Sequence, residues 1–191
     1  MRRPDLPPAN GFTMIEMLVT VVIAAILAAI AVPQMREYIE RTRVAGAANE
    51  LASDMRLARA FVLQHNQPIW VTFGSTADYT CYVIYTEGNL TGSCNCARVG
   101  RPMCDGGFDP QVALRSVYIK RSTGVTLTAT TPDLRFTEAV GAPQIGFETY
   151  GNALAEIGSS LGGRVKVTLH GMTRAVICSM SGHTAEFGAC P

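Results

Sequence analysis

The sequence lacks a charge imbalance, and it lacks any recognised arrangement of catalytic groups. Lys and Arg number 16 against 15 Asp and Glu, a formal net charge of +1. This balance excludes a whole-chain electrostatic footprint for nucleic acid or anionic lipid and leaves room only for a local basic patch. The three histidines, His65, His170 and His183, stand in no catalytic motif, so we expect them at turns or on the surface. We expect neither an enzyme nor a cofactor.

Cysteine is absent from the first 80 residues and then occurs six times. An even number of cysteines downstream of an apolar segment indicates disulfides and an oxidising compartment, with fifteen pairings open. Cys178 and Cys190 bracket a short C-terminal segment, which a turn at Ser181 and Gly182 would fold back, so they are the pair we most expect. Closing that loop stabilises a fold by about 3 kcal/mol. The six are Cys81, Cys94, Cys96, Cys104, Cys178 and Cys190.

The stretch from residue 88 to residue 110 is rich in glycine and contains the segment CNCARVGRPMC. Its three cysteines, together with Cys81, offer the alternative of four thiolate ligands for a metal. Their spacing does not match the paired CxxC of common zinc sites. On grounds of compartment we therefore expect disulfides and no metal.

The most apolar part of the chain runs from residue 12 to residue 32. As a helix, these 21 residues rise about 30 Å, enough to cross a hydrocarbon core. The run is longer than the apolar region of a secretory signal peptide, which has about 7 to 15 residues. Its single charged residue, Glu16, would cost about 2.5 to 3.5 kcal/mol in lipid and is therefore a functional-site hypothesis.

The charges on either side of this run give a weak indication of orientation. Arg2 and Arg3 precede it, and Arg36, Arg41 and Arg43 follow it. The positive-inside rule alone would therefore slightly favour a cytoplasmic C-terminal part. The cysteines indicate the opposite, and we give them more weight, so we expect the C-terminal part outside the cytosol.

Helical periodicity continues beyond the apolar run. Pro33 should kink the helix or open one turn, because it removes a hydrogen bond to residue i−4. The sequence His65-Asn66-Gln67-Pro68 predicts the helix end. An apolar stripe comprises Met35, Tyr38, Ile39, Ala45, Ala48, Leu51, Ala52, Met55, Ala58 and Val62. The opposite face, expected to be solvated, comprises Arg36, Glu37, Glu40, Arg41, Arg43, Glu50, Asp54, Arg56 and Arg59.

After Pro68 the apolar period changes from helical spacing to two. With 191 residues, of which 48% are hydrophobic, the chain can hold one globular domain and an appendage. A long helix followed by strands predicts an α+β head with the helix packed on an antiparallel sheet. The expected strands cover residues 69–73, 79–85, 114–119, 125–129, 164–169 and 174–179.

The N-terminal motif resembles the leader of type IV pilins and type II secretion pseudopilins. Gly11, Phe12 and Glu16 stand at the positions that the family uses before its long apolar helix. The resemblance implies that a prepilin peptidase cuts between Gly11 and Phe12 and methylates Phe12. It also implies that Glu16 meets the N-terminal amine of a neighbouring subunit, a pairing that would make a carboxylate tolerable in lipid. An incidental acid near the membrane edge is the alternative.

The segment after the membrane run resembles the GspH/FimT family of minor pilins and pseudopilins. Leu51, Met55, Ala58 and Arg59 match its Leu-x-x-x-(Leu/Met)-x-x-Ala-Arg helix end, and Phe147 with Gly151 loosely matches a later F-x-x-x-G feature. The resemblance is firm over the N-terminal third of the chain and weak beyond it.

Some members of this family bind DNA through a C-terminal Gly-Arg-x-Arg stretch, whose arginines contact phosphate. This chain has Gly182-His183-Thr184-Ala185-Glu186 there, without the arginines. DNA binding is therefore not favoured, although Arg164, Lys166 and Arg174 could form a basic patch on one sheet.

The resemblance leads to one reading with two alternatives. It implies a minor type IV pilin that primes or caps a fibre, with a leader over residues 1–11, a transmembrane helix over 12–36 and a head over 37–191. Its partners would be other pilins, the prepilin peptidase and the inner membrane, with the head in the periplasm or on an extracellular pilus. The alternatives are an H-type minor pseudopilin of type II secretion and a DNA-binding minor pilin.

Overall fold

The structure is a computed structural model of the whole chain. It describes residues 12–86, 93–100, 102–104, 112–130, 133–136, 143–145, 148–149, 155–170, 174–181 and 187–190. The chain forms two compact units, Met1–Glu37 and Tyr38–Pro191, and each is described by itself.

One helix, α1, runs from Met14 to His65 and contributes residues to both units. It ends where the sequence predicts. The amide of Asn66 donates a hydrogen bond of 2.9 Å to the carbonyl of Val62, and Asn66 itself has φ of 51°. This left-handed conformation is a usual helix C-terminus, and Pro68 then prevents further helix.

In the second unit, one face of α1 is buried. The predicted apolar stripe is confirmed from Ala45 onward, whereas Tyr38 and Ile39 are 70% and 41% exposed. The described side-chain contacts of α1 with the rest of the head begin after these two residues, where Glu40 meets Ser159 at the end of β8 and Arg43 meets Thr123 at the end of η1. The buried positions with apolar side chains are Val44, Ala45, Ala48, Leu51, Ala52, Met55, Ala58 and Val62.

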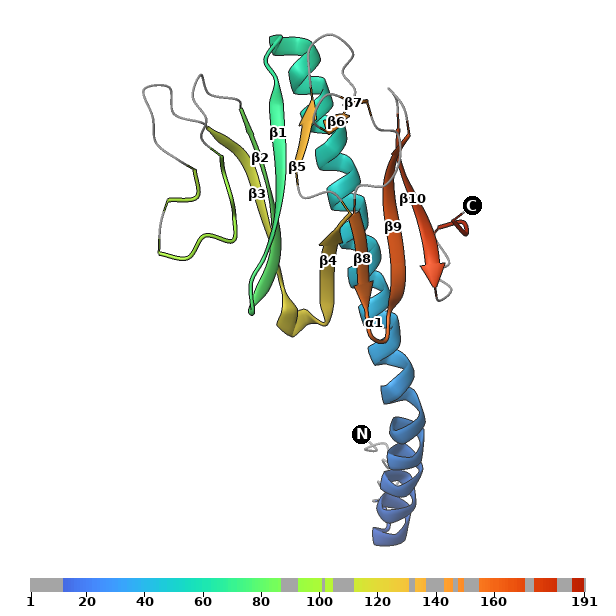
Figure 1. Cartoon of the computed structure of the whole chain (residues 1–191). Coiled ribbons are helices and arrows are strands. Elements are labelled where there is room, and N and C mark those ends of the chain that lie inside the picture. Colours follow the sequence, from blue (N-terminus) through green and yellow to red (C-terminus); the bar gives the residue numbers. More distant parts are fainter. Residues whose placement is uncertain are drawn as a thin grey trace, which may run out of the picture. The chain divides into compact units, whose positions relative to one another are not determined.

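The head contains two antiparallel sheets (Figure 1). The six-stranded sheet has the order β3-β2-β1-β5-β6-β7, and the four-stranded sheet has the order β10-β9-β8-β4. The first comprises β1 (Ile69–Ser75), β2 (Tyr79–Thr86), β3 (Ala113–Lys120), β5 (Asp133–Phe136), β6 (Pro143–Ile145) and β7 (Glu148–Thr149). The second comprises β4 (Val125–Ala129), β8 (Ala155–Ser159), β9 (Gly163–His170) and β10 (Arg174–Ser181).

The α+β class and all six expected strands are confirmed, and the antiparallel strands divide between two sheets. After β3 the chain turns through the short 3-10 helix η1 (Arg121–Thr123) and Gly124. Strand β4 then pairs with β8 instead of β3. Beside the first sheet, the amide of Leu127 donates to the hydroxyl of Thr80 at 3.1 Å.

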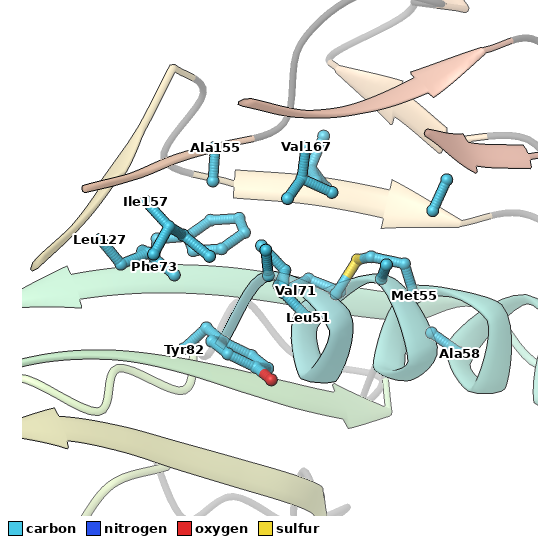
Figure 2. Close-up of a cluster of buried hydrophobic side chains, with 14 of the residues drawn as sticks. Leu51, Met55, Ala58, Val71, Phe73, Tyr82, Leu127, Ala155, Ile157 and Val167 are labelled. Atoms are coloured by element: carbon cyan, nitrogen blue, oxygen red, sulfur yellow. The ribbon is translucent and has the colours of Figure 1, made fainter. Parts of the chain in front are cut away.

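A shared core joins α1 to both sheets (Figure 2). Leu51 and Met55 of the helix lie among side chains from β1, β2, β4, β8 and β9. Both are at most 1% exposed. Each large apolar side chain buried in this way stabilises the fold by about 1.5 to 3 kcal/mol.

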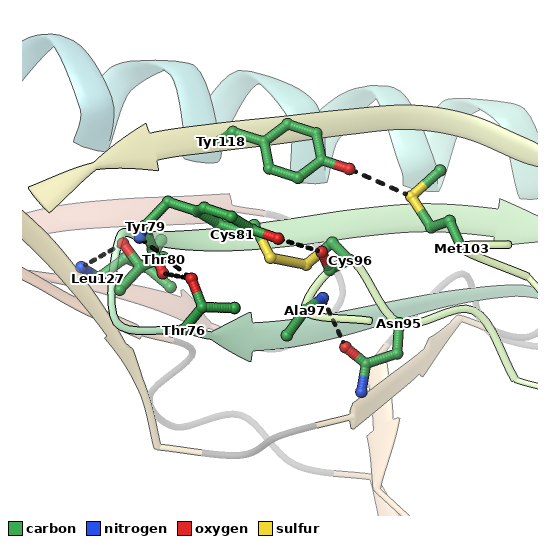
Figure 3. The surroundings of a disulfide bond; sticks show 10 residues. All are labelled: Thr76, Tyr79, Thr80, Cys81, Asn95, Cys96, Ala97, Met103, Tyr118 and Leu127. Atoms are coloured by element: carbon green, nitrogen blue, oxygen red, sulfur yellow. Dashed lines mark hydrogen bonds between the residues drawn. A yellow bond between two sulfur atoms is a disulfide. The ribbon is translucent and has the colours of Figure 1, made fainter. Parts of the chain in front are cut away.

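A second, smaller cluster covers the other face of the six-stranded sheet. Strand β2 is therefore buried along both faces. Two disulfides, Cys81–Cys96 (Figure 3) and Cys94–Cys104, hold the covering loop in place. At Gly74 of β1 a Cβ atom would lie 2.9 Å from the Cβ of Ala97, so this close approach of the loop requires glycine.

The third disulfide joins Cys178 to Cys190, the pair singled out from the sequence. The amide of Ser179 donates to the carbonyl of Gly188 at 2.8 Å, and the amide of Cys190 donates to the carbonyl of Ser179 at 3.0 Å. Ser179 and Ala189 thus form a parallel bridge. A turn at Ser181 and Gly182 that joined adjacent strands would make an antiparallel hairpin. That expected turn is wrong, because residues 188–190 run parallel to β10.

Candidate functional site

The first turn of α1 contains the sequence-predicted Glu16. Its amide donates to the carbonyl of Thr13 at 3.1 Å and to the Thr13 hydroxyl at 3.3 Å. Thr13 and Glu16 therefore occupy the first and last positions of a capping box, and an acid in the first turn also suits the helix dipole. This local role was not predicted, although Thr-x-x-Glu before an apolar run is its ordinary sequence signal.

The described residues that follow form an exposed apolar surface in the first unit. Helix α1 contains a stretch long and apolar enough to cross a membrane, and none of that stretch is buried. Phe12 is 80% exposed. The helix continues across Pro33, so the kink stays a prediction, and Gly11 lies outside the described residues.

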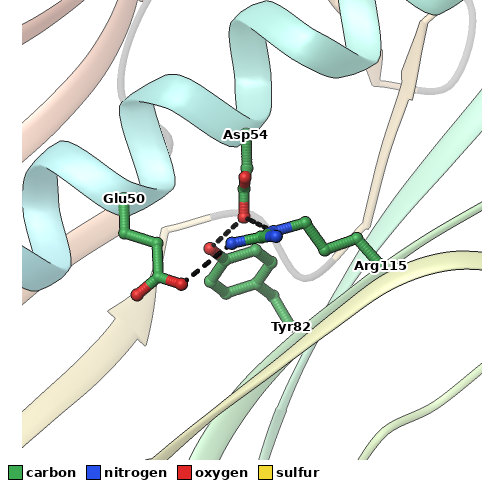
Figure 4. A network of polar contacts seen from close by, with 4 residues as sticks. All are labelled: Glu50, Asp54, Tyr82 and Arg115. Atoms are coloured by element: carbon green, nitrogen blue, oxygen red, sulfur yellow. Dashed lines mark hydrogen bonds and ion pairs between the residues drawn. The ribbon is translucent and has the colours of Figure 1, made fainter.

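A buried polar network links α1 to the first sheet (Figure 4). The carboxylate of Asp54 accepts a hydrogen bond of 2.7 Å from the hydroxyl of Tyr82 and one of 2.5 Å from Nε of Arg115. Arg115 also pairs with Glu50 at 3.0 Å. Burial, together with the hydrogen bond to Asp54, raises the pKa of Tyr82, and the same carboxylate raises the pKa of Arg115.

This network corrects the expected solvated face of the helix. Asp54 is only 5% exposed, because Arg115 of β3 and Tyr82 of β2 reach it across the helix–sheet interface. Arg59 is also partly buried, and its Nε has no hydrogen-bond partner in the part of the chain that the structure describes. Neither residue belongs to a fully solvated face.

The ends of two connections contact helix residues 40–43, and a third connection contacts η1. We call this end of the second unit the entry rim. It consists of helix residues 40–43, turn residues 76–78, η1 with its flanking residues 120 and 124, and residues 159–162 at the end of β8 and in the following turn.

The carboxylate of Glu40 accepts a hydrogen bond from the hydroxyl of Ser159, and Nη1 of Arg43 donates to the carbonyl of Thr123 at 3.2 Å. At Gly162 a Cβ atom would lie 2.8 Å from the carbonyl carbon of Glu40. The rim is thus packed tightly against the helix.

The turn between β1 and β2 belongs to the same end. Nε of Arg121 donates to the carbonyl of Thr76 at 2.9 Å, and its Nη2 donates to the hydroxyl of Ser75 at 2.7 Å. The amide of Arg121 donates to the carbonyl of Asp78 at 2.8 Å. These bonds fix the position of the Arg121 charge.

An open groove of about 530 Å³ begins beside the rim and runs over β4 and β8. Four hydroxyl side chains, the carboxylate of Glu156 and the guanidinium of Arg164 are its polar lining residues. The Arg164 side chain lies across Gly158, where a Cβ atom would be only 2.6 Å from Cγ of Arg164. The lining residues are Gly124, Thr126, Thr128, Glu156, Gly158, Ser159, Ser160 and Arg164.

The structure spreads out the three residues considered for DNA. Arg164 and Lys166 are two positions apart in β9 and therefore share one face of the sheet, but Lys166 stands opposite Glu156 of β8. Arg174 pairs with His170, four positions along β10 from the partner of Lys166, a separation of about 13 Å. The stretch from Gly182 to Glu186 lies outside the described residues, as do Phe147 and Gly151.

All six cysteines are paired in disulfides, so no thiolate remains for the alternative metal site. His65 is exposed at the helix end with its ring centroid 4.2 Å from that of Phe61. His183 lies outside the described residues, and only the backbone of His170 is described.

Comparison with known proteins gives two family matches. The family described as "Prokaryotic N-terminal methylation motif" matches residues 7–32, and the family described as "Type II transport protein GspH" matches residues 47–182. No solved structure gives a significant match.

Curated relatives are fimbrial proteins. The chain is 37% identical over 82 residues to a fimbrial protein of Pseudomonas aeruginosa, covering 42% of this chain and 51% of the relative. It is 39% identical over 84 residues to the type IV major fimbrial protein FimA of Dichelobacter nodosus, covering 44% and 46%. The chain thus spans about half the length of the curated relatives it matches. Because the GspH match covers most of the chain and follows an N-terminal methylation motif, the protein belongs to the GspH family within the type IV pilin superfamily.

Proposed function

We propose that the protein is a minor type IV pilin of the GspH/FimT class, a subunit that primes or caps a fibre. The observation that carries the proposal is the order of its parts: a methylation motif, an exposed apolar helix and a GspH head. A pilin or pseudopilin is a structural subunit and not an enzyme, it assembles with other pilins, and its methylation motif implies processing by a prepilin peptidase.

Processing is the first step to test. With a prepilin peptidase present, we propose cleavage between Gly11 and Phe12 and methylation of Phe12, which leaves a membrane-anchored chain with its head in the periplasm. Intact mass of the membrane-purified chain, with and without reductant, measures both modifications at once. We expect a methylated species beginning at Phe12 that is lighter by six hydrogens than its reduced form, two for each disulfide. An uncut chain would remove the main support for the proposal.

Glu16 has two roles to separate, as helix cap and as partner of a neighbouring amine. Glutamine keeps the capping box but removes the charge, whereas alanine removes both. If register in the fibre depends on the ion pair, Glu16→Gln and Glu16→Ala should both fail to incorporate, while the wild-type chain enters the fibre. Normal incorporation of Glu16→Gln alone would assign Glu16 to capping. Normal incorporation of Glu16→Ala would refute both roles.

The H-type minor pseudopilin of type II secretion is a second candidate, favoured by the description of the matching family as a type II transport protein. Affinity purification of the full chain from native membranes separates the two. Copurified pilus subunits, with the chain also present in fibres shed from the cell surface, would support the pilus. Copurified secretion components, with loss of protein export in a deletion strain, would support the secretion machine.

DNA binding is the weakest of the three candidates, because Glu156 stands beside the only basic pair on the second sheet's described strands. Its electrostatic contribution would fall steeply with salt. A salt-dependent binding assay on the processed chain, compared with Arg164→Gln, tests it.

A further inference from the structure

One arginine of α1 has a buried donor with nothing to bond to. Arg59 is partly buried, and its Nε is a buried side-chain nitrogen without a hydrogen-bond partner among the described residues. No other side chain in the part of the chain that the structure describes has such an atom. An unsatisfied buried donor costs free energy, and native proteins contain few of them, so this one needs an explanation.

The helix itself does not supply the explanation. The helix dipole favours cations only within the last turn, and Arg59 lies six residues before His65, where α1 ends. On the helix surface, the neighbours three and four positions away from Arg59 are a methionine, an arginine, a valine and a leucine. None of them can accept a hydrogen bond from a guanidinium as a carboxylate would.

The rest of the head does not neutralise Arg59 either. The sequence has no Asp or Glu between Asp54 and Asp78. Asp54 is occupied by Tyr82 and Arg115, and the ion pairs of the described residues do not include Arg59. Within the described part of its own subunit, the guanidinium therefore has neither a counter-charge nor an acceptor for Nε.

The surface around Arg59 suits a protein segment that bears a carboxylate. Arg56 and Leu63, three positions before and four positions after, lie on the same side of α1, and both are exposed. A carboxylate matches a guanidinium because its two oxygens accept two parallel N–H bonds, one of which can come from Nε. The exposed leucine adds apolar area that a partner larger than a free ion can cover.

We infer that Arg59 is a docking residue of the assembled subunit, where its guanidinium pairs with a carboxylate on a neighbouring pilin. The inference rests on the assembly with other pilins in the proposed function, and it names one contact of that assembly in the head. Nε is out of reach of solvent in the separate subunit, so the side chain turns outward as the neighbour arrives. Docking thereby removes the cost of the unpartnered donor, which favours the assembled subunit over the separate one.

Stability and incorporation separate this role from a purely structural one. Arg59→Met keeps an unbranched side chain but removes the donor and the charge. We expect the full chain in micelles to unfold at the same or a higher urea concentration than the wild type, because no unsatisfied donor is left. In cells that make the other pilins, we expect about tenfold less of the variant in sheared fibres, because a hydrogen bond to a charged group is lost. Lys120→Met, the control that removes an exposed cation of β3, should change neither.

Arg59→Lys identifies the chemical group that docks. The substitution keeps the positive charge, so the variant still enters fibres. A carbodiimide joins a lysine amine to a carboxylate in contact with it, and we expect an amide bond between position 59 and an acidic residue of another pilin. Mass spectrometry of digested fibres locates both residues, and the same treatment of the separate chain in micelles should give no such product.

Three results would overturn the inference. Unfolding of Arg59→Met at a lower urea concentration would make Arg59 a structural residue of the head. Normal incorporation of Arg59→Met would show that no docking contact depends on it. In fibres that contain Arg59→Lys, an amide bond within the same chain, or none at position 59, would exclude a neighbour's carboxylate. Absence of the wild-type chain from fibres would instead refute the proposed function.

Discussion

Removing the carboxylate of Asp54 should destabilise the head more than any neighbouring change on the exposed helix surface. Asp54→Ala leaves the Tyr82 hydroxyl buried without its 2.7 Å acceptor and takes away one partner of Arg115. Breaking a buried ion pair costs about 3 to 5 kcal/mol. Here that is an upper bound, because the Arg115 side chain is 41% exposed and keeps Glu50.

The cost therefore comes mainly from the hydroxyl. A hydrogen bond to a charged group contributes about 1.5 to 3 kcal/mol, and a buried unsatisfied donor costs about 1 to 3 kcal/mol. We expect Asp54→Ala to lower the free energy of unfolding by about 2 to 3 kcal/mol. Ser53→Ala, at the exposed neighbouring position, should change it by less than about 0.5 kcal/mol.

Urea unfolding of the full chain in micelles, with disulfides intact and the fluorescence of Trp70 as probe, measures these changes. A double-mutant cycle of Asp54→Ala with Tyr82→Phe isolates the contact between the two side chains. We expect a coupling free energy of about 1.5 to 3 kcal/mol. Additivity within about 0.5 kcal/mol would refute the reasoning, because it would mean that hydroxyl and carboxylate do not interact.

Three further predictions concern the head. Because the pKa of Tyr82 is raised in the folded head, its contribution to stability is present below the unfolded pKa of about 10 and is lost as pH rises above that value. Tyr82→Phe should therefore reduce the fall in unfolding free energy at alkaline pH. Parallel plots of unfolding free energy against pH for the variant and the wild type would contradict this. Gly162→Ala places a Cβ atom 2.8 Å from the helix backbone and should lower the free energy of unfolding by about 1 to 3 kcal/mol. Gly46→Ala, where a Cβ atom would have nothing within 4 Å, should raise it by about 0.5 to 1 kcal/mol. Equal effects of the two substitutions would contradict tight packing of the entry rim against the helix. Replacing Cys178 and Cys190 by serine should lower stability by about 3 kcal/mol and expose the end of β10 to hydrogen exchange, and unchanged protection would show that the disulfide is not needed there.

The parts of the fold that local pattern determines were predictable. The buried stripe of α1 follows helical spacing, and Asn66 with Pro68 marks its end. Strand β8 was missed because Ala155, Gly158 and Ser159 have low strand propensity. It is a strand because it pairs with both β4 and β9, and Gly158 leaves room for the Arg164 side chain of β9. These partners lie elsewhere in the chain, so the local sequence of β8 does not indicate them.

The candidate sites divide in the same way. Glu16 could be found because its neighbours in sequence carry the signal. Asp54 could not, because its partners Tyr82 and Arg115 are 28 and 61 positions away and only the register of β2 and β3 brings them to it. Cys178 and Cys190 could be predicted as a pair because they bracket a short segment at the end of the chain, whereas the other two bridges depend on how a loop lies on a sheet.

The parallel bridge between Ser179 and Ala189 has a consequence for solubility in a crowded assembly. Strand β10 is an outer strand of its sheet, and an open outer strand is a template for pairing with another chain. The segment held by Cys178–Cys190 occupies the hydrogen-bonding groups of β10 at Ser179. Oxidation therefore keeps the hydrogen-bonding groups of β10 at Ser179 occupied within the head, so fewer of them are open to edge-to-edge pairing with another chain.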